Sequence, residues 1–444
     1  MRWEQRVKYA SLSDIGFRRK NNQDSLSVQI CSDQGTWSQY GHLFLVADGM
    51  GGHAVGELAS KIAADTLPHT YYKSRGKDMG VALKHAIERA NSTIFERGAH
   101  NHEFTRMGTT CTALVLGPEG AVIGHVGDSR VYRVRGSRIE QLSFDHSLHW
   151  ELTKQGRLDP DDEIVRKSRH VITRSLGPEE TVEVDVEGPH SVLPSDVYVL
   201  CSDGLVGHVK DAEIGAIARE LPPAEACRLL VSLANLRGGS DNITVLIVHV
   251  GELPEGITPA EKSAPVEPDG GLNWWWLAGM WAVAITLVSG ISMRLLGAGV
   301  LAGALITAVS VIAAGALVLK WLNTRQSEKT GESISGDPDE TVYWKPYRSS
   351  PAKLDSDFLS HLVAVEAELR RTASQEGWTI DWKRHDTAYN SAREALSAGR
   401  YNEALGKLAS TIDVLMCGVQ DYRRQLQRDR KWGKTPLPVN RQEK

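Results

Sequence analysis

Four short apolar runs in the first 250 residues of the chain carry an aspartate at one end, and this pattern restricts the folds available to it. FLVADG, VIGHVGD and YVLCSDG end at or beside Asp48, Asp128 and Asp203, and SDNITVLIVHV begins with Asp241. Runs of this length predict buried β-strands. One such aspartate is ordinary turn chemistry, but sheet geometry can bring several strand ends to one edge. Carboxylates crowded there repel each other unless a proton or cation neutralises them.

An all-oxygen set of this kind favours a hard divalent cation, Mg²⁺ or Mn²⁺, over zinc. The sequence contains no His/Cys cluster for a softer metal, and its five cysteines are scattered. The stretch GMGGH after Asp48 leaves the backbone bare enough to approach an ion or a phosphate. The carbonyl of Gly49 could therefore join the ligands.

Length and charge set broad limits. The 444 residues predict about two or three domains. With 51 basic and 55 acidic side chains, a net charge of −4, the chain does not suit nucleic-acid binding by bulk attraction to phosphate. The N-terminus MRWEQRVKYASLSDIG lacks the apolar core of a secretory signal peptide, so we expect the first 250 residues to begin in the cytoplasm.

Residues 1–252 predict an α+β domain built on antiparallel sheets. Short β-rich runs are separated by two stretches with helical periodicity, at 54–67 and 81–97. Residues 253–273 are rich in proline, glycine and charge and are typical of a linker.

Residues 274–319 form an apolar stretch in which Arg294 is the only charged residue. The stretch is about twice the roughly 20 residues that one membrane span needs, so it predicts a hairpin of two transmembrane helices. Tryptophans at both ends suit the membrane–water interface, and basic residues after it favour a cytoplasmic C-terminus. The alternative is a buried hairpin of a globular domain.

A second polar linker is predicted at 320–350, followed by an all-α domain at 351–444. The segment AYNSAREALSAGRYNEALGKLASTIDVL reads as a helix, a turn and another helix, and it resembles one tetratricopeptide-type hairpin. Because a single repeat cannot bury a solenoid core, a small helical bundle is an equal alternative.

Eight motifs together resemble the metal-dependent protein phosphatase 2C family in its bacterial form. They follow the family's order and spacing over about residues 5–250, whereas the apolar stretch and the C-terminal helices lie outside the resemblance. The motifs are SDIGFRRKNNQDS, ADGMGGHAVGE, MGTTCTALVL, GHVGDSRVYRV, DHSLHWELTKQGRL, VITRSLG, CSDGL and GGSDNITVLIV.

The resemblance implies a sandwich of two antiparallel sheets flanked by helices, with a metal site at one edge. The ligands it implies for a pair of Mn²⁺ or Mg²⁺ ions are Asp48, the Gly49 carbonyl, Asp203 and Asp241. Asp128 matches the carboxylate that, with Asp203, holds a third, weaker metal in bacterial members.

The resemblance also implies roles for Arg19, Asp24 and His53. Arg19 matches the phosphate-binding arginine, since a guanidinium can hold two phosphate oxygens; by spacing alone it would be part of a solvated basic loop. Asp24 matches the residue that orients the attacking water, and His53 the proposed general acid. The alternative for His53 is a helix-start histidine with no catalytic part. The implied reaction is direct hydrolysis by a water held between the two ions.

Two departures from the family pattern concern the surroundings of the site. Gln23 stands where the family usually has glutamate before the aspartate that matches Asp24. The stretch IVRKSRH, residues 164–170, replaces the usual His-Pro and Asn of the flap region, which leaves substrate choice and the third metal open.

The function expected is therefore a serine/threonine phosphoprotein phosphatase of the inner membrane, with its catalytic and C-terminal domains in the cytoplasm. Its expected partners are phosphoserine and phosphothreonine proteins, among them Ser/Thr kinases or their substrates, and no nucleic acid. Two alternatives remain: a non-catalytic phosphoprotein-binding scaffold of the same fold, and a phosphatase dedicated to one anti-sigma-type regulator. The sequence leaves the physiological substrate, the preferred metal, the oligomeric state and the role of the last domain open.

Overall fold

The computed structural model describes residues 7–51, 54–74, 76, 78–100, 104, 107–154, 171–251, 286, 288–290, 292–293, 301–302, 304–310 and 346–431. The chain divides into two compact units, one made of residues 1–261 and 344–444 and the other of residues 262–343.

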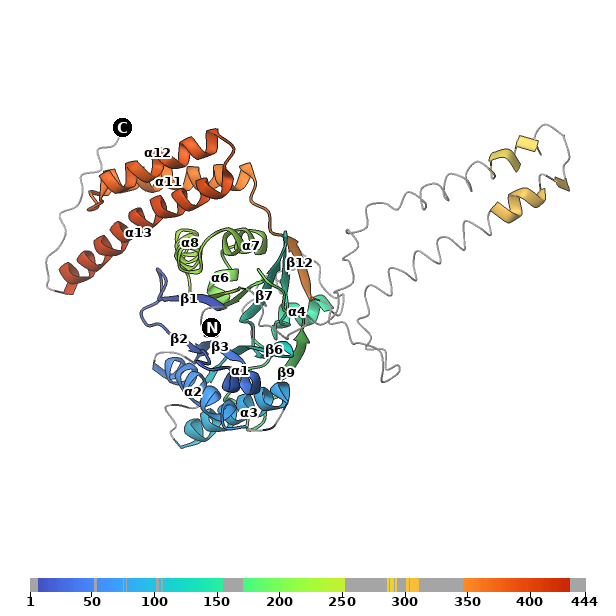
Figure 1. The fold of residues 1–444 in the computed structure, drawn as a ribbon, viewed down its shortest axis with the longest axis horizontal. Helices are drawn as coiled ribbons and strands as arrows, with labels where there is room; N and C mark the ends of the chain where they lie inside the picture. Colours follow the sequence, from blue (N-terminus) through green and yellow to red (C-terminus); the bar gives the residue numbers. More distant parts are fainter. Residues whose placement is uncertain are drawn as a thin grey trace. The chain divides into compact units, whose positions relative to one another are not determined.

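Two antiparallel sheets form the centre of the first unit (Figure 1). The first sheet has the order β1-β11-β10-β7-β8-β12, and the second has the order β2-β3-β5-β6-β9, with β4 paired to β3. The strands of the first sheet are β1 (Val7–Asp14), β7 (Arg130–Arg135), β8 (Arg138–Gln141), β10 (Val197–Cys201), β11 (Ile243–Val250) and β12 (Arg348–Pro351). Those of the second are β2 (Asp24–Gln29), β3 (His42–Met50), β4 (Gly108–Thr109), β5 (Cys111–Gly117), β6 (Gly120–Val126) and β9 (Asp185–His190).

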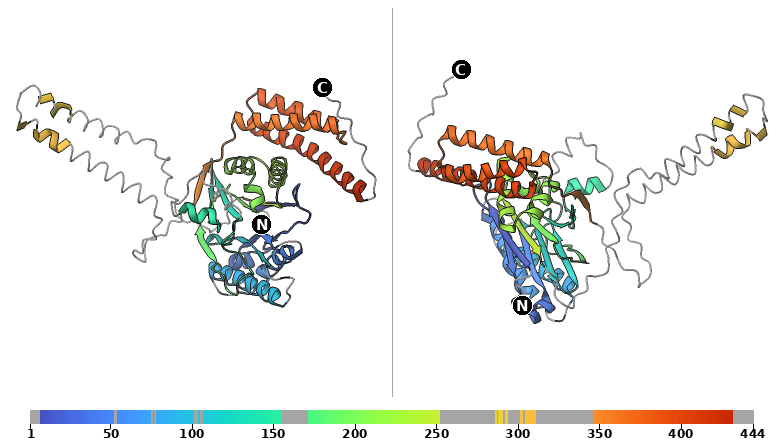
Figure 2. Two further views of the ribbon diagram at one scale, coloured as in Figure 1. Left: turned by 180° about the vertical axis from the view of Figure 1, so that it is seen from behind. Right: turned by 45° about the horizontal axis from the view of Figure 1, so that its top comes forward.

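Helices lie on the outer face of each sheet (Figure 2). The two helices predicted at 54–67 and 81–97 fall within α2 and α3, and the antiparallel α+β architecture is confirmed. The side chain of Asp78 caps α3 by accepting hydrogen bonds from the amides of Gly80 and Val81. The helices of the N-terminal half are α1 (Gln34–Tyr40), α2 (Ala54–Tyr71), α3 (Met79–Ala99), α4 (Leu148–Lys154), α6 (Asp203–Val206), α7 (Asp211–Glu220) and α8 (Pro223–Leu236).

The alternation of side chains along β3 explains why both faces of its sheet are buried. Phe44 and Val46 point into an apolar layer that they share with Leu246 of the facing sheet. Leu43 and Leu45 point the other way, into the cluster made with α2 and α3. A strand covered on both faces is apolar throughout, as FLVA is.

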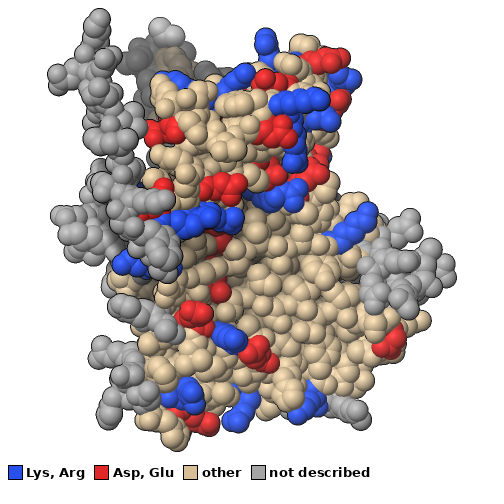
Figure 3. All heavy atoms as spheres, turned by 90° about the vertical axis from the view of Figure 1, so that its left-hand side faces the viewer, with Lys and Arg blue, Asp and Glu red and all other residues tan. Residues whose placement is uncertain are grey.

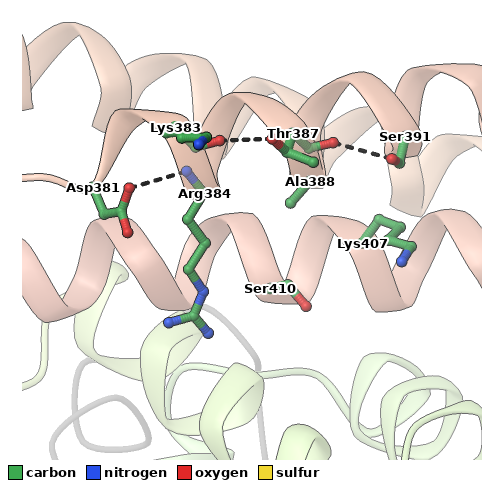
Figure 4. Close-up of a pocket in the computed structure, with 8 residues that line it drawn as sticks. All are labelled: Asp381, Lys383, Arg384, Thr387, Ala388, Ser391, Lys407 and Ser410. Atoms are coloured by element: carbon green, nitrogen blue, oxygen red, sulfur yellow. Dashed lines mark hydrogen bonds between the residues drawn. The ribbon is translucent and has the colours of Figure 1, made fainter.

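The C-terminal domain is helical, as predicted, and consists of α11 (Ser356–Glu376), α12 (Trp382–Ser397) and α13 (Tyr401–Lys431). The side chain of Asp381 caps α12 by accepting a hydrogen bond from the amide of Arg384. The hydroxyl groups of Thr387 and Ser391 donate hydrogen bonds to main-chain carbonyls of the same helix (Figure 4). Outward faces carry charges of both signs, which gather toward the top of the face in Figure 3, where these helices lie.

Helix α13 shares one apolar core with α8. Leu408 and Ile412 of α13 are fully buried in the same cluster as Leu229 and Leu233 of α8. An ion pair between Arg228 and Asp413, 3.5 Å long, lies beside this contact. The C-terminal helices are therefore packed onto the sandwich as part of one folded unit.

Strand β12 was not predicted, because RSSP has none of the β-branched or aromatic residues typical of strands. It begins within the segment 320–350 that the sequence assigns to a linker. Its pairing with β8, Arg348 opposite Gln141 and Ser350 opposite Ile139, places it at the edge of the first sheet. Main-chain pairing at an edge needs little from the side chains, so composition gave no signal.

Most of the predicted transmembrane hairpin, 274–319, lies outside the described residues. The described pieces at 286, 288–290, 292–293, 301–302 and 304–310 are helical. Within the part of the chain that the structure describes, no helix has the length and apolar character needed to cross a membrane. The hairpin stays a prediction.

The shared core of α8 and α13 predicts a large effect of shortening Ile412, which is completely buried. Replacing it with alanine removes buried methylene groups and leaves a cavity, so we expect Ile412→Ala to lower the free energy of unfolding by about 2–5 kcal/mol. Urea denaturation measures this. Lys407→Ala, on the exposed face of the same helix, serves as the control and should change it by less than about 0.5 kcal/mol. Equal values for both variants would show that α13 does not share the core.

Candidate active site

The predicted acidic residues stand at neighbouring strand ends. Asp24 begins β2 and lies opposite Asp48 of β3 in the sheet register. Asp203 opens α6 directly after β10, and Asp241 lies just before β11, which pairs with β10. Asp128 lies just after β6. The turns from strand to loop thus bring these five side chains to one edge of the sandwich.

The charges of these residues act on one another. Burial raises the pKa of Asp48 well above its ordinary value, and the carboxylates of Asp24, Asp203, Asp128 and Asp241 raise it further. Burial likewise raises the pKa of Asp128, with Asp203 as the strongest neighbouring charge. These residues therefore share one electrostatic neighbourhood in which negative charge is costly.

Asp24 is held in this neighbourhood by hydroxyl groups. Its Oδ2 accepts a hydrogen bond of 2.8 Å from Ser202 Oγ. Burial raises its pKa to about 7, although hydrogen bonds from Thr244 and Ser202 oppose the rise and the charge of Asp203 adds to it. Ser202 Oγ in turn accepts from the amide of Thr244 at 3.0 Å, so one hydroxyl ties β2 to β11.

Two buried carboxylate oxygens indicate what could neutralise this charge. Oδ1 of Asp24 and Oδ1 of Asp128 are buried and have no hydrogen-bond partner among the described residues. A buried acceptor without a donor is costly, and a hard cation or a water bound to one would satisfy it. The donor atoms therefore suit Mg²⁺ or Mn²⁺. In the described residues, however, no group of three or more His, Cys, Asp or Glu side chains is arranged so that it could hold a metal ion.

Arg19 lies at the acidic edge. Its Nη2 is 2.6 Å from Asp241 Oδ2, and about half of its side chain is exposed. The hydrogen bond to Asp241 raises the pKa of Arg19, partial burial opposes this, and the charges of Asp48 and Asp203 add to the rise. An exposed guanidinium beside these carboxylates can meet an anionic ligand that arrives from solvent.

The main chain of Asp48 is fixed by two threonines to which the sequence gave no role. Asp48 N donates to Thr110 Oγ1 at 2.8 Å, and Asp48 O accepts from Thr110 N at 2.8 Å and from Thr109 Oγ1 at 2.9 Å. Both threonines lie in the motif MGTTCTALVL. Two adjacent threonines in an otherwise apolar run are unusual, and this pattern could have indicated that their hydroxyl groups have a structural role.

Asn242 was also missed as a structural anchor. Its Oδ1 accepts from Gln23 N at 2.8 Å, and its Nδ2 donates to Ile15 O at 2.9 Å and to Asn21 O at 3.0 Å. One amide thus holds both ends of the loop that carries Arg19. The carboxamide of Asn242 supplies both a donor and an acceptor, which an aspartate at this position could not.

The glycines after Asp48 are needed for packing, in addition to the expected close approach of an ion or a phosphate. A Cβ atom at Gly49 would overlap the carbonyl oxygen of Gly56, and one at Gly56 would overlap the side chain of Gln23. Strand β3 and the first turn of α2 therefore approach more closely than any side chain allows. His53, between these two glycines, lies outside the described residues.

A cavity of about 700 Å³ opens beside this edge and is lined by Asp128 and Asp203. Arg130 lies in its wall and donates hydrogen bonds from Nε and Nη2 to Asp145 Oδ2, at 2.9 and 2.6 Å. Strand β12 contributes Arg348 to the same wall. The cavity is large enough for a phosphorylated side chain.

The family comparison matches residues 18–214 to a sequence profile described as Protein phosphatase 2C. The chain is 34% identical over 247 residues to a putative protein phosphatase 2C-type of Streptococcus pyogenes, covering 55% of this chain and 97% of that protein. It is 33% identical over 250 residues to protein phosphatase PhpP of Streptococcus pneumoniae, covering 55% and 98%.

A mycobacterial relative and one solved structure complete the comparison. Serine/threonine protein phosphatase PstP of Mycobacterium tuberculosis is 32% identical over 263 residues, covering 59% of this chain and 49% of that protein. The crystal structure of PstP/Ppp is similar with a TM-score of 0.49 at 33% identity, covering 55% of this chain and 99% of that one.

The raised pKa of Asp24 predicts how the stability of the metal-free protein depends on pH. In the unfolded chain the carboxyl group titrates near 3.8, and in the folded protein near 7. The folded state holds the proton more tightly, so the stabilisation is complete below the unfolded value and is lost as pH rises through the folded value. We expect the melting temperature of the full chain in chelator to fall from roughly pH 5 to roughly pH 8.

Asp24→Asn is the matched control for this titration, because the amide has the same shape and does not ionise. Its melting temperature in chelator should fall less over the same pH range. A wild-type protein whose stability stays constant or rises toward pH 8, or a variant that follows the wild-type curve, would contradict the assignment.

Proposed function

The chain belongs to the protein phosphatase 2C family, a family of hydrolases, and from this premise we propose that it removes phosphate from phosphoserine and phosphothreonine in proteins, with Mn²⁺ or Mg²⁺ as cofactor. Its relatives PhpP and PstP are protein phosphatases, PstP by name a serine/threonine one. The observation that carries the proposal is the set of partly or fully buried, mutually repelling carboxylates at one edge of the sandwich, with Arg19 beside them.

The residues proposed to hold a pair of metal ions are Asp48, the Gly49 carbonyl, Asp203 and Asp241, with Asp128 and Asp203 at a third position. When bound, the ions would polarise water and offset negative charge on the phosphoryl group. The ion pair between Arg19 and Asp241 is compatible with metal binding by Asp241, because the Arg19 guanidinium can leave this carboxylate and bind a phosphate instead.

The protein's own groups then perform four tasks. Arg19 binds phosphate oxygens and fixes the orientation of the phosphoryl group. Asp24 is held at Oδ2 by Ser202, and its Oδ1, which has no partner among the described residues, would accept a hydrogen bond from the attacking water. Thr109 and Thr110 keep Asp48 in place, which keeps the site preorganised. His53 is the proposed proton donor to the leaving oxygen.

We also propose that the 274–319 stretch anchors the protein in the inner membrane, with both folded domains in the cytoplasm. The support is compositional: one charge in the whole stretch. Several of the described apolar side chains of this stretch are exposed, Leu301 by 84%, Leu305 by 67% and Val309 by 64%. Exposed leucine and valine of this extent are costly in water and favourable in lipid.

The catalytic proposal predicts metal-dependent turnover by the full chain. We expect hydrolysis of an aryl phosphate and of a phosphothreonine peptide with Mn²⁺ or Mg²⁺, and none in chelator. Asp203→Ala should lower kcat/KM by at least about 100-fold, since even outer partners of metal ligands are worth about 10- to 100-fold. Asp65→Ala, which removes an exposed carboxylate of α2, is the control.

Two outcomes would contradict the catalytic proposal. Turnover that survives chelator or Asp203→Ala would remove the metal assignment. Tight binding of the phosphopeptide without any turnover would instead favour the phosphoprotein-binding scaffold.

The membrane proposal predicts that the full chain stays with the membrane fraction after a carbonate wash. Deletion of residues 274–319 should release it, because the apolar stretch supplies the anchor. Immunoblots of the two fractions measure this, and recovery of the intact chain in the wash would overturn the anchor.

A further inference from the structure

Helix α13 of the C-terminal domain reaches the loop that carries Arg19. Arg423 Nη2 donates a hydrogen bond of 2.7 Å to the main-chain oxygen of Phe17. The guanidinium carbon of Arg423 lies 4.0 Å from the centroid of the Phe17 ring. Arg423 therefore holds both the main chain and the side chain of Phe17, by a hydrogen bond and by a cation–π contact.

Phe17 is in turn fastened to the loop that precedes β11. The amides of Phe17 and Arg18 both donate to Gly239 O, at 2.8 and 3.0 Å. A Cβ atom at Gly16 would overlap the carbonyl oxygen of Asp241, so the two loops lie in close main-chain contact. Displacing Phe17 would loosen this pair of loops.

These loops carry two of the proposed active-site groups. Arg19 lies two residues beyond Phe17, and its guanidinium pairs with Asp241 at 2.6 Å. A continuous series of contacts thus runs from Arg423 on α13, through Phe17 and Gly239, to Arg19 and Asp241. Each contact in the series is a hydrogen bond or a main-chain approach too close to admit a side chain.

We propose that Arg423 is a positioning residue of this active site: α13 holds the Phe17–Arg19 loop so that Arg19 faces the acidic edge. The inference rests on the proposed function for the role of Arg19. It assigns the C-terminal helices a task in the reaction, because the shared core with α8 supplies the rigid base from which Arg423 acts.

The contact between Arg423 and Phe17 involves a C-terminal region that the alignment with a shorter relative does not include. PhpP aligns over 250 residues that include 98% of its length, so little of it is left to provide a counterpart of α13. In such a relative the equivalent loop would rely on its contacts within the sandwich. In the present chain, displacement of α13 from α8 would weaken phosphate binding at a distance.

The test compares variants of the full chain by steady-state kinetics on a phosphothreonine peptide. Arg423→Ala should raise KM by about threefold to tenfold with a smaller change in kcat, since residues in one contact network are coupled by this amount. The KM of Arg423→Lys should lie between those of the wild type and Arg423→Ala, because lysine keeps the charge and a donor but cannot stack as a planar group on the Phe17 ring. Arg424→Ala is the matched control: its side chain is 68% exposed and pairs with Asp421 of the same helix.

Amide hydrogen exchange on the metal-free protein gives a readout that does not depend on turnover. The amides of Phe17 and Arg18 should exchange faster in Arg423→Ala than in wild type or Arg424→Ala. Phe17→Leu, which removes the ring and keeps an apolar side chain, should raise KM similarly, and combining it with Arg423→Ala should add little.

The outcomes separate this inference from the proposed function. Wild-type KM together with wild-type exchange at Phe17 and Arg18 in Arg423→Ala would overturn the positioning role and leave Arg423 as a docking contact only. A wild-type chain that does not hydrolyse the peptide would overturn the proposed function, and the amide exchange would still decide whether Arg423 holds the loop.

Discussion

The repulsion among buried carboxylates is the constraint on which the rest of this structure depends. Asp24, Asp48 and Asp128 all have raised pKa values, because burial and neighbouring negative charges act in the same direction. A fold that keeps such groups together must gain from them elsewhere, since each costs stability when ionised. Because these carboxylates offer only oxygen atoms, binding of a hard cation would offset this cost. The surrounding hydrogen bonds hold the carboxylates in place for such binding.

Hydrogen bonds from several parts of the chain hold the residues of that edge in place. Threonine hydroxyls fix the main chain of Asp48, Ser202 fixes Asp24, and Asn242 fixes the loop of Arg19. The layers of the sandwich support these contacts from behind, and α13 adds a further contact through Arg423. The site therefore depends on parts of the chain that lie more than 400 residues apart in sequence, Phe17 and Arg423.

The antiparallel architecture, the two long N-terminal helices and the gathering of aspartates could be predicted because each leaves a local pattern. Alternating or continuous apolar runs indicate strands, and an aspartate after such a run indicates a strand end. Strand β12 and the anchor role of Asn242 could not be predicted. Both depend on main-chain groups that are distant in sequence and become neighbours only in the folded protein. The contact of Arg423 with Phe17 likewise has no local signal in α13, where arginine is also typical of an exposed helix surface.

The most direct test of the central claim is anomalous diffraction from crystals of the full chain soaked in Mn²⁺. The account predicts anomalous peaks among Asp48, Asp203 and Asp241, with these carboxylates turned toward them and Arg19 released from Asp241. Well-diffracting, Mn²⁺-soaked crystals with no peak at this edge, and with the Arg19–Asp241 pair intact, would contradict it.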